Sequence, residues 1–328
     1  PTISITNSIA FANMKDAQSE FGLVRMGGTV GWILAAWPFT FILVDWARVP
    51  EFGSLPFTEW LGTALGTGKQ EAAFREASRY IFLVAGSASM VMAVFSLTLP
   101  HTPPRPAAAG AERFAWLEAM KLLGRPFVLV LFIVTFLDAA VHQTFFVWTE
   151  RYLTGRIGIE SNWVSPVMKI GQVAEIVTMV FLGYVLKNLG WRITMVFGVL
   201  GHAARFAVFA YYPEPWAAIS INVVHGICYA FFFATVYIFV DEFFPKDARS
   251  SAQGLFNFLI LGIGPFVANF ASTRLGAVYE IVDATGAKTV DFRQIFLYPL
   301  ITALAAAALL LLLFHPPAKA EADDEGTH

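Results

Sequence analysis

The sequence predicts an all-helical membrane protein that crosses the bilayer several times. Hydrophobic residues make up 57% of the chain and charged residues 14%, against a charged share of about 25% in an average globular domain. The mean hydropathy is +0.61, and apolar runs recur at the length of about 20 residues that a helix needs to span a bilayer. A net charge of -2 gives no sign of a nucleic-acid partner. The single cysteine, Cys228, excludes an internal disulfide, and we expect neither a metal nor another cofactor.

The first part of the chain predicts one partial span and two full spans. Residues 1–14 are too short to cross, and their small and polar side chains are typical of a helix that lines a cavity. Full spans are expected at about 23–46 and 79–99. Between them, residues 47–77 predict a loop with a short amphipathic helix on the membrane surface.

The rest of the chain predicts a linker, six spans and a tail. Residues 101–125 are rich in Pro and Ala and then amphipathic, which is typical of a connection between two helical bundles. The acidic segment 316–328 is expected to be disordered. About eight full spans and a partial one result. The last six lie at about 126–148, 163–187, 191–212, 216–240, 251–273 and 294–314.

Residues 21–39 place an arginine inside an otherwise apolar segment. A charge near the middle of a bilayer costs roughly 3 kcal/mol or more unless it faces protein or a watery cavity, so we expect Arg25 to point inward at an anionic group. Thr29 and Trp32 follow at spacings of four and three, which puts the three side chains on one helix face. The alternative is that Arg25 lies at the start of its helix and extends to the lipid headgroups.

Polar and ionisable side chains also occur in pairs within later spans. These groups are costly in lipid, so they indicate either a polar cavity or a set of buried ion pairs. In the second case Glu175 pairs with Arg205 or Lys169 and only holds helices together. The pairs lie three or four residues apart: Asp138 and His142, Gln172 and Glu175, and His202 and Arg205.

Three stretches resemble a known family. The order of arginine, threonine, glycine and tryptophan within residues 25–32 is similar to the fifth transmembrane helix of the nucleoside:proton symporter family, a branch of the major facilitator superfamily. Residues 225–233 resemble its helix ten, and residues 248–254 resemble the start of its helix eleven. The resemblance runs over nearly the whole chain.

The resemblance implies a multi-pass protein of the cell (inner) membrane that is built from two helical bundles. Residues 1–100 are then a remnant of the N-terminal bundle, with about three and a half helices absent, and 101–125 form a cytoplasmic linker. Residues 126–315 form a complete C-terminal bundle of six helices. Residues 183–192 resemble the superfamily's signature loop, although Lys187 stands where that motif prefers an aspartate. Any short loop could also contain such glycines and cations.

The resemblance also implies a ligand site. The family places a glutamine and a glutamate three apart on helix eight to hold the nucleoside, and Gln172 and Glu175 match them in type and spacing. A nucleoside offers hydroxyls to amide and carboxylate groups and a flat base to aromatic rings. The other contacts expected from the matched stretches and from helix seven are Arg25, Thr29, Trp32, His142, Phe145, His225 and Tyr229.

Proton coupling is affected by one departure from the family. Its helix ten commonly carries an aspartate directly after the tyrosine, and here that place is Ala230, which cannot carry a proton. The remaining candidates for the proton carrier are Glu175 and Asp138, and the family position favours Glu175. Asp138 can instead be held ionised in a structural pair with His142.

We therefore expect a secondary transporter that moves nucleosides or a similar small polar solute together with protons, by alternating access. One alternative is a facilitator of another solute, such as a sugar, without proton coupling. Another is a receptor or scaffold that does not transport. An enzyme is not expected, because neither an HExxH nor a GxSxG motif occurs and the histidines are scattered. The expected partners are the solute, protons and the lipid bilayer.

Overall fold

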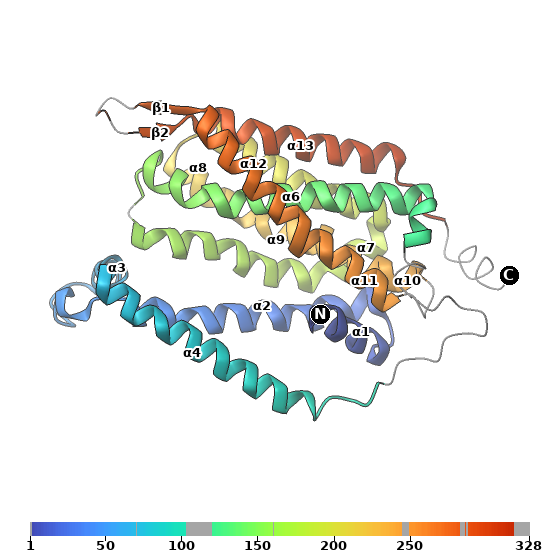
Figure 1. Ribbon diagram of the computed structural model, residues 1–328, viewed down its shortest axis with the longest axis horizontal. Helices are drawn as coiled ribbons and strands as arrows, with labels where there is room; N and C mark the ends of the chain where they lie inside the picture. The colour runs from blue at the N-terminus through green and yellow to red at the C-terminus, as the bar shows by residue number, and fades with distance from the viewer. Residues whose placement is uncertain are drawn as a thin grey trace.

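The structure is a computed structural model in which the helices run side by side along one long axis (Figure 1). The described residues are helical apart from turns, an isolated bridge and one short β-hairpin, so the predicted all-helical class is confirmed. Six of the helices are long and apolar enough to cross a membrane. The residues that the structure describes are 2–69, 71–102, 120–159, 161–244, 249–282, 286 and 288–317.

The first part of the chain contains four helices and one helical turn. The carboxylate of Asp16 caps the second helix by accepting a hydrogen bond from the backbone N–H of Gln18 at 3.1 Å. The charged run 69–77, which we predicted to belong to a loop and a surface helix, mostly forms the start of the fourth helix instead. The elements are α1 (Thr2–Asn13), α2 (Ala17–Ile42), η1 (Trp46–Arg48), α3 (Phe57–Gly66) and α4 (Glu71–Ser96).

Helices α2 and α4 differ in how they pack. The first half of α2 lies against α7 (Ser161–Tyr211), and Gly183 permits this contact, because a Cβ there would lie 2.7 Å from the carbonyl oxygen of Gln18. Small residues permit such a close approach of two helices in membranes. By contrast, α4 leaves nearly all of its described side chains exposed, among them Phe82 and Met90. In a membrane, such an apolar surface faces lipid or other helices.

The remaining elements hold most of the buried hydrophobic core, to which α1 and α2 add Phe11 and Phe21. Helices α8 to α10 follow one another as a single rod that contains a π-helical turn, and α11 and α12 form a second rod of this kind. Helix α13 packs along α7 and α6. The elements besides α7 are η2 (Leu122–Gly124), α6 (Pro126–Gly155), α8 (Pro215–Ser220), η3 (Ile221–Val223), α9 (Val224–Cys228), η4 (Tyr229–Ala234), α10 (Thr235–Phe243), α11 (Arg249–Phe258), η5 (Leu259–Ile263), α12 (Gly264–Val278) and α13 (Phe292–Leu313).

Helix α7 consists of two arms, residues 161–189 and 191–211, joined at Gly190. This glycine has φ 70° and ψ 175°, a left-handed conformation that other residues rarely adopt. The bend turns one long helix into two spans, in agreement with the spans predicted at 163–187 and 191–212. With the two arms of α7 counted separately and with α2, which is 26 residues long, added to the candidate spans, eight helices match the predicted full spans.

A β-hairpin between α12 and α13 was not predicted. Its strands, β1 (Glu280–Val282) and β2 (Lys288–Val290), are antiparallel, with Glu280 opposite Val290. The ammonium of Lys288 donates a hydrogen bond to Glu280 Oε1 at 2.7 Å, and this bond raises the pKa of Lys288. Most of the expected linker (103–119), most of the acidic tail (318–328) and the loop 245–248 lie outside the described residues, so the expectations for them stay predictions.

Candidate functional site

Four polar side chains from α2, α7 and η4 meet in a group that we call the outer centre: Arg25, Thr29, Glu175 and Tyr229. The hydroxyl of Thr29 donates to Glu175 Oε1 at 2.6 Å. The guanidinium of Arg25 donates to the hydroxyl of Tyr229 and lies 5.1 Å from the centre of its ring. Arg25 therefore points inward, and the alternative that it extends to the lipid headgroups is wrong.

The carboxylate of Glu175 has its partners on α2. It accepts the Thr29 hydroxyl and interacts electrostatically with Arg25. Arg205 is bound elsewhere and Lys169 is not a partner, so the predicted alternative of a Glu175 ion pair with either residue is wrong. Only 6% of Glu175 is exposed. The outer centre thus joins the N-terminal part of the chain to the later helices by charge-assisted hydrogen bonds.

Two residues predicted to contact a ligand lie beside the outer centre without bonding to it. Gln172 is one turn before Glu175 and half-buried, and its Oε1 has no hydrogen-bond partner among the described residues. Such an acceptor suits a donor from outside the chain. Trp32 is one turn after Thr29 on α2 and 66% exposed, so its ring is accessible.

Arg205 forms the middle of a second polar group, the inner centre, which also contains Asp138, His142, His202 and His225. The guanidinium is 0% exposed. Its Nη2 lies 2.7 Å from His202 Nδ1, and its Nη1 lies 3.0 Å from His225 Nδ1. His202 Nε2 lies 3.6 Å from Asp138 Oδ2. Asp138 therefore faces His202 on the second arm of α7, not His142 on its own helix, and the predicted pair of Asp138 and His142 is wrong.

Phe145 packs against the guanidinium at the middle of the inner centre. The guanidinium carbon of Arg205 lies 3.9 Å from the centre of its ring, a cation–π contact. Only 2% of Phe145 and 5% of His225 is exposed. Both were predicted to contact a ligand, but in this structure they are covered, because the buried arginine requires an aromatic face and an acceptor around it. Phe145 thus packs against the inner centre, and His225 belongs to it.

His142 is the member of the inner centre that lies beside the outer centre. Its ring stacks on His225 with centroids 5.1 Å apart, and it lies 6.4 Å from the ring of Tyr229. The backbones approach closely at the same place, since a Cβ on Gly226 would lie 2.5 Å from the carbonyl oxygen of Ala174. The two centres are therefore neighbours that are packed without room for an additional methyl group.

A cavity of about 540 Å³ opens beside Arg25, between α1, α2 and the residues Leu99 and Pro100 that follow α4. Its volume is within the range of about 300 to 1,000 Å³ that is typical of small-molecule sites. Thr6, Asn7 and Asn13 of α1 contribute polar groups to its wall, and Asn7 Nδ2 has no hydrogen-bond partner within the described ranges. The prediction that residues 1–14 line a cavity is thus confirmed.

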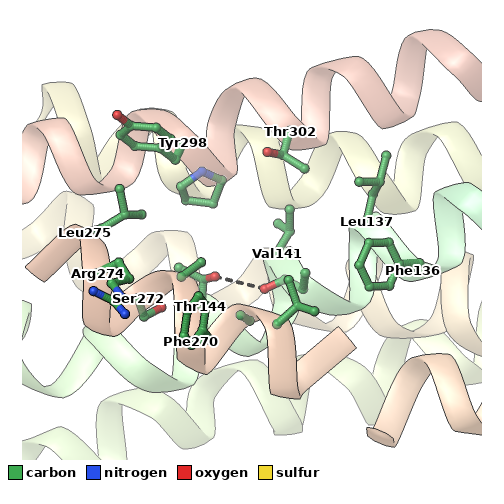
Figure 2. A pocket seen from close by; sticks show the side chains of 15 residues that line it. Phe136, Leu137, Val141, Thr144, Phe270, Ser272, Arg274, Leu275, Tyr298 and Thr302 are labelled. Carbon is green, nitrogen blue, oxygen red and sulfur yellow. Dashed lines mark hydrogen bonds between the residues drawn. The ribbon is translucent and has the colours of Figure 1, made fainter. Parts of the chain in front are cut away.

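A second pocket, of about 480 Å³, lies between α6, α12 and α13 (Figure 2). Its wall is mostly apolar, with side chains such as Leu137, Val141 and Leu275, and the Thr144 hydroxyl that borders it is bonded to the carbonyl of Ala140. None of the residues in either polar centre lines it. We therefore place the candidate site at the outer centre.

The contacts of Asp138 with His202 and of His225 with Arg205 could not be predicted from the sequence. The spacing of His202 and Arg205 identified a pair on one helix face, but not its partners, because α6, α7 and α9 meet through long-range packing. An arginine and a histidine within an apolar span are nevertheless a signal for buried charge compensation.

The described residues contain no group of three or more His, Cys, Asp or Glu side chains that could hold a metal ion.

The sequence model of a family described as "Nucleoside H+ symporter" matches residues 1–58 and 54–319. The chain belongs to this nucleoside H+ symporter family. YegT of Escherichia coli (strain K12) is 29% identical over 288 residues, which are 85% of this chain and 60% of YegT. Nucleoside permease NupG of the same strain is 23% identical over 330 residues, 94% of this chain and 70% of NupG. The chain thus spans about 60% of the length of YegT.

Solved structures show the same fold. The crystal structure of a variant of the nucleoside transporter NupG has a TM-score of 0.64 and 22% sequence identity, and covers 96% of this chain and 74% of that one. The major facilitator superfamily transporter FucP, in its outward conformation, has a TM-score of 0.63 and 11% identity, with 94% and 70% covered. The predicted major facilitator fold and the predicted family are therefore confirmed.

Proposed function

We propose that the protein transports nucleosides across the cell (inner) membrane together with protons, by alternating access. The observation that carries this proposal is the outer centre, because its hydrogen bonds run between α2 and the later helices. Bonds between two groups of helices can break and reform as the groups move relative to each other. The family match and the permease activity in the name of NupG support a nucleoside as the solute. An enzyme activity is not proposed, because the family consists of transporters.

In this proposal the nucleoside binds at the outer centre and in the cavity beside Arg25. Glu175 and Gln172 accept hydrogen bonds from the ribose hydroxyls, since a carboxylate and an amide carbonyl both accept. Trp32 and Tyr229 supply rings for the base. Thr29 and Arg25 hold Glu175 and Tyr229 in place until the ligand arrives. His142 lies next to Tyr229 and forms the inner wall of the site.

The division into two bundles is also part of this proposal. Residues 126–315 act as one body, since they hold most of the buried core, and residues 1–100 belong to the other body. The outer centre would then be the contact between them. Two observations support this division. In the N-terminal part, α2 reaches the later helices mainly through α7, and α4 leaves nearly all of its described side chains exposed.

Uptake of radiolabelled nucleosides and sugars by cells that express the intact protein tests the proposal. We expect nucleoside uptake that falls when a protonophore abolishes the proton gradient. Gln172→Ala and Glu175→Ala should each lower uptake about tenfold or more, since a hydrogen bond to a charged group contributes about 1.5 to 3 kcal/mol. Asn269→Ala is the control, because this exposed amide lies on α12, away from the site.

Each alternative has its own outcome in this assay. Sugar uptake without an effect of the protonophore would indicate a facilitator of another solute. No uptake of any probe, with normal amounts of protein in the membrane, would indicate a receptor or scaffold. Normal nucleoside uptake by both variants would show that Gln172 and Glu175 do not form the site.

A further inference from the structure

The buried arginine determines which nitrogen of each neighbouring histidine carries hydrogen. An arginine side chain donates hydrogen bonds and cannot accept them. Because Arg205 contacts His202 Nδ1 at 2.7 Å and His225 Nδ1 at 3.0 Å, both Nδ1 atoms must accept. A neutral imidazole that accepts at Nδ1 carries its hydrogen at Nε2. His202 therefore presents an N–H group on the side opposite to Arg205.

That N–H group faces a carboxylate without hydrogen bonds. His202 Nε2 lies 3.6 Å from Asp138 Oδ2. Neither oxygen of Asp138 has a hydrogen-bond partner in the part of the chain that the structure describes, and both residues are 0% exposed. Guanidinium, imidazole and carboxylate thus form a row from α7 to α6. A buried carboxylate without hydrogen bonds is costly, and uptake of one proton removes its charge.

We propose that Asp138 and His202 form a proton-holding pair that is separate from the nucleoside site, with Arg205 as the residue that positions it. In the empty state, the charges of Arg205 and Asp138 compensate each other through the imidazole. A proton taken up from water binds to the pair and gives the inner centre one net positive charge. The face of Phe145 and the acceptor nitrogens around Arg205 stabilise that charge. The proton returns to water on the other side of the membrane.

Several other titratable groups lie around the pair of Asp138 and His202. His142 lies on α6 with its ring 5.3 Å from that of His202, and His225 contacts Arg205 from α9. Cys228, also on α9, interacts electrostatically with Arg205 and Asp138 and is fully buried. Arg205 is the charge that acts on Asp138. Among these groups, Asp138 is the one that carries a carboxyl group.

The two candidate proton carriers differ in their hydrogen bonds. Glu175 accepts a hydrogen bond from Thr29 and lies near Arg25, so donors stabilise its ionised form. Asp138 has no such donor. The pair is also in reach of the ligand site, because the ring of His142 contacts His202, His225 and Tyr229. Coupling between proton and nucleoside would pass through His142. This part of the inference rests on the proposed function.

A test without any ligand examines the pair itself. Infrared difference spectra between alkaline and acid pH are recorded for the intact protein in lipid nanodiscs. We expect a carboxyl band on acidification that is lost in Asp138→Asn and kept in Glu175→Gln. In His202→Gln the midpoint of this band should shift, although the amide can still accept from Arg205 and donate to Asp138 and so preserve the fold. An unchanged midpoint in this variant, or a band lost in Glu175→Gln and kept in Asp138→Asn, would overturn the inference.

A second measurement connects the pair to transport. The affinity for radiolabelled uridine is measured against pH, and we expect a change of up to tenfold per pH unit if one proton is linked to binding. Asp138→Asn should remove this dependence and His202→Gln should shift it to another pH, while Glu175→Gln should weaken binding and keep the dependence. A pH dependence that Asp138→Asn leaves intact would contradict the linkage. If uridine and other nucleosides do not bind, but the infrared band depends on Asp138 and His202, the proposed function fails and the proton-holding pair stands.

Discussion

The outer and inner centres contain similar side chains but are built for different tasks. The outer centre uses Arg25 and Glu175 from two different parts of the chain, and a cavity opens beside it. The inner centre uses Arg205 and Asp138, both 0% exposed, on helices that share one core. Groups that meet between separate segments and border a cavity can exchange their partners for a ligand, whereas the groups of the inner centre, buried within one core, are covered from a ligand of that size. In the proposals above, the outer centre therefore responds to the solute and the inner centre to a proton.

The largest expected difference between the centres concerns folding. Arg205→Ala leaves Asp138 buried without a counter-charge, and removal of one partner of a buried pair costs about 3 to 5 kcal/mol. We expect little folded protein and a markedly lower melting temperature by fluorescence-detected size exclusion. Arg25→Ala should leave the melting temperature nearly unchanged and abolish nucleoside binding, because Arg25 lies at the edge of the cavity.

A double variant provides the control for this comparison. Replacement of both partners, Arg205→Met with Asp138→Leu, removes both charges, and exchange of a whole buried pair for apolar groups is often neutral. This variant should recover most of the melting temperature that Arg205→Ala loses. Failure to recover would mean that hydrogen bonds to His202 and His225, not charge compensation by Asp138, hold the inner centre together.

The sequence identified the ionisable members of both centres but not their grouping. Helical spacing placed Arg25 and Thr29 on one face, and lipid cost required Arg25 to face inward, which the structure confirms. Spacing also paired Asp138 with His142, which is wrong, because a residue on another helix can lie nearer than one turn along the same helix. Partners across helices depend on packing, which a single sequence does not display. Gly226 illustrates this limit, since its contact appears only once α9 lies on α7.

A smaller effect is expected from a methyl group between the centres. In Gly226→Ala the new Cβ would lie 2.5 Å from the carbonyl oxygen of Ala174 and from the backbone nitrogen of Glu175. Helix α9 must then move away from α7, at a cost of about 1 to 3 kcal/mol for overpacking. Because Glu175 belongs to the outer centre, nucleoside affinity should fall together with the melting temperature. Gly27→Ala is the matched control, since no atom lies within 4 Å of a Cβ there. A loss of melting temperature without a loss of affinity would show that the close contact does not shape the ligand site.

The smallest expected effect on folding, and the sharpest test of the outer centre as a ligand site, is Trp32→Ala. This side chain is 66% exposed, so its removal should change the free energy of unfolding by less than about 0.5 kcal/mol. Stacking of a base on an aromatic ring contributes about 1 to 3 kcal/mol, so the affinity for uridine should fall about fivefold or more if Trp32 contacts the base. Trp216→Ala is the matched control, because Trp216 is 73% exposed and lies on α8, outside both centres. Equal uridine affinities for the two variants and the wild type, measured by radioligand binding, would remove Trp32 from the site and leave Tyr229 as the aromatic group of the outer centre.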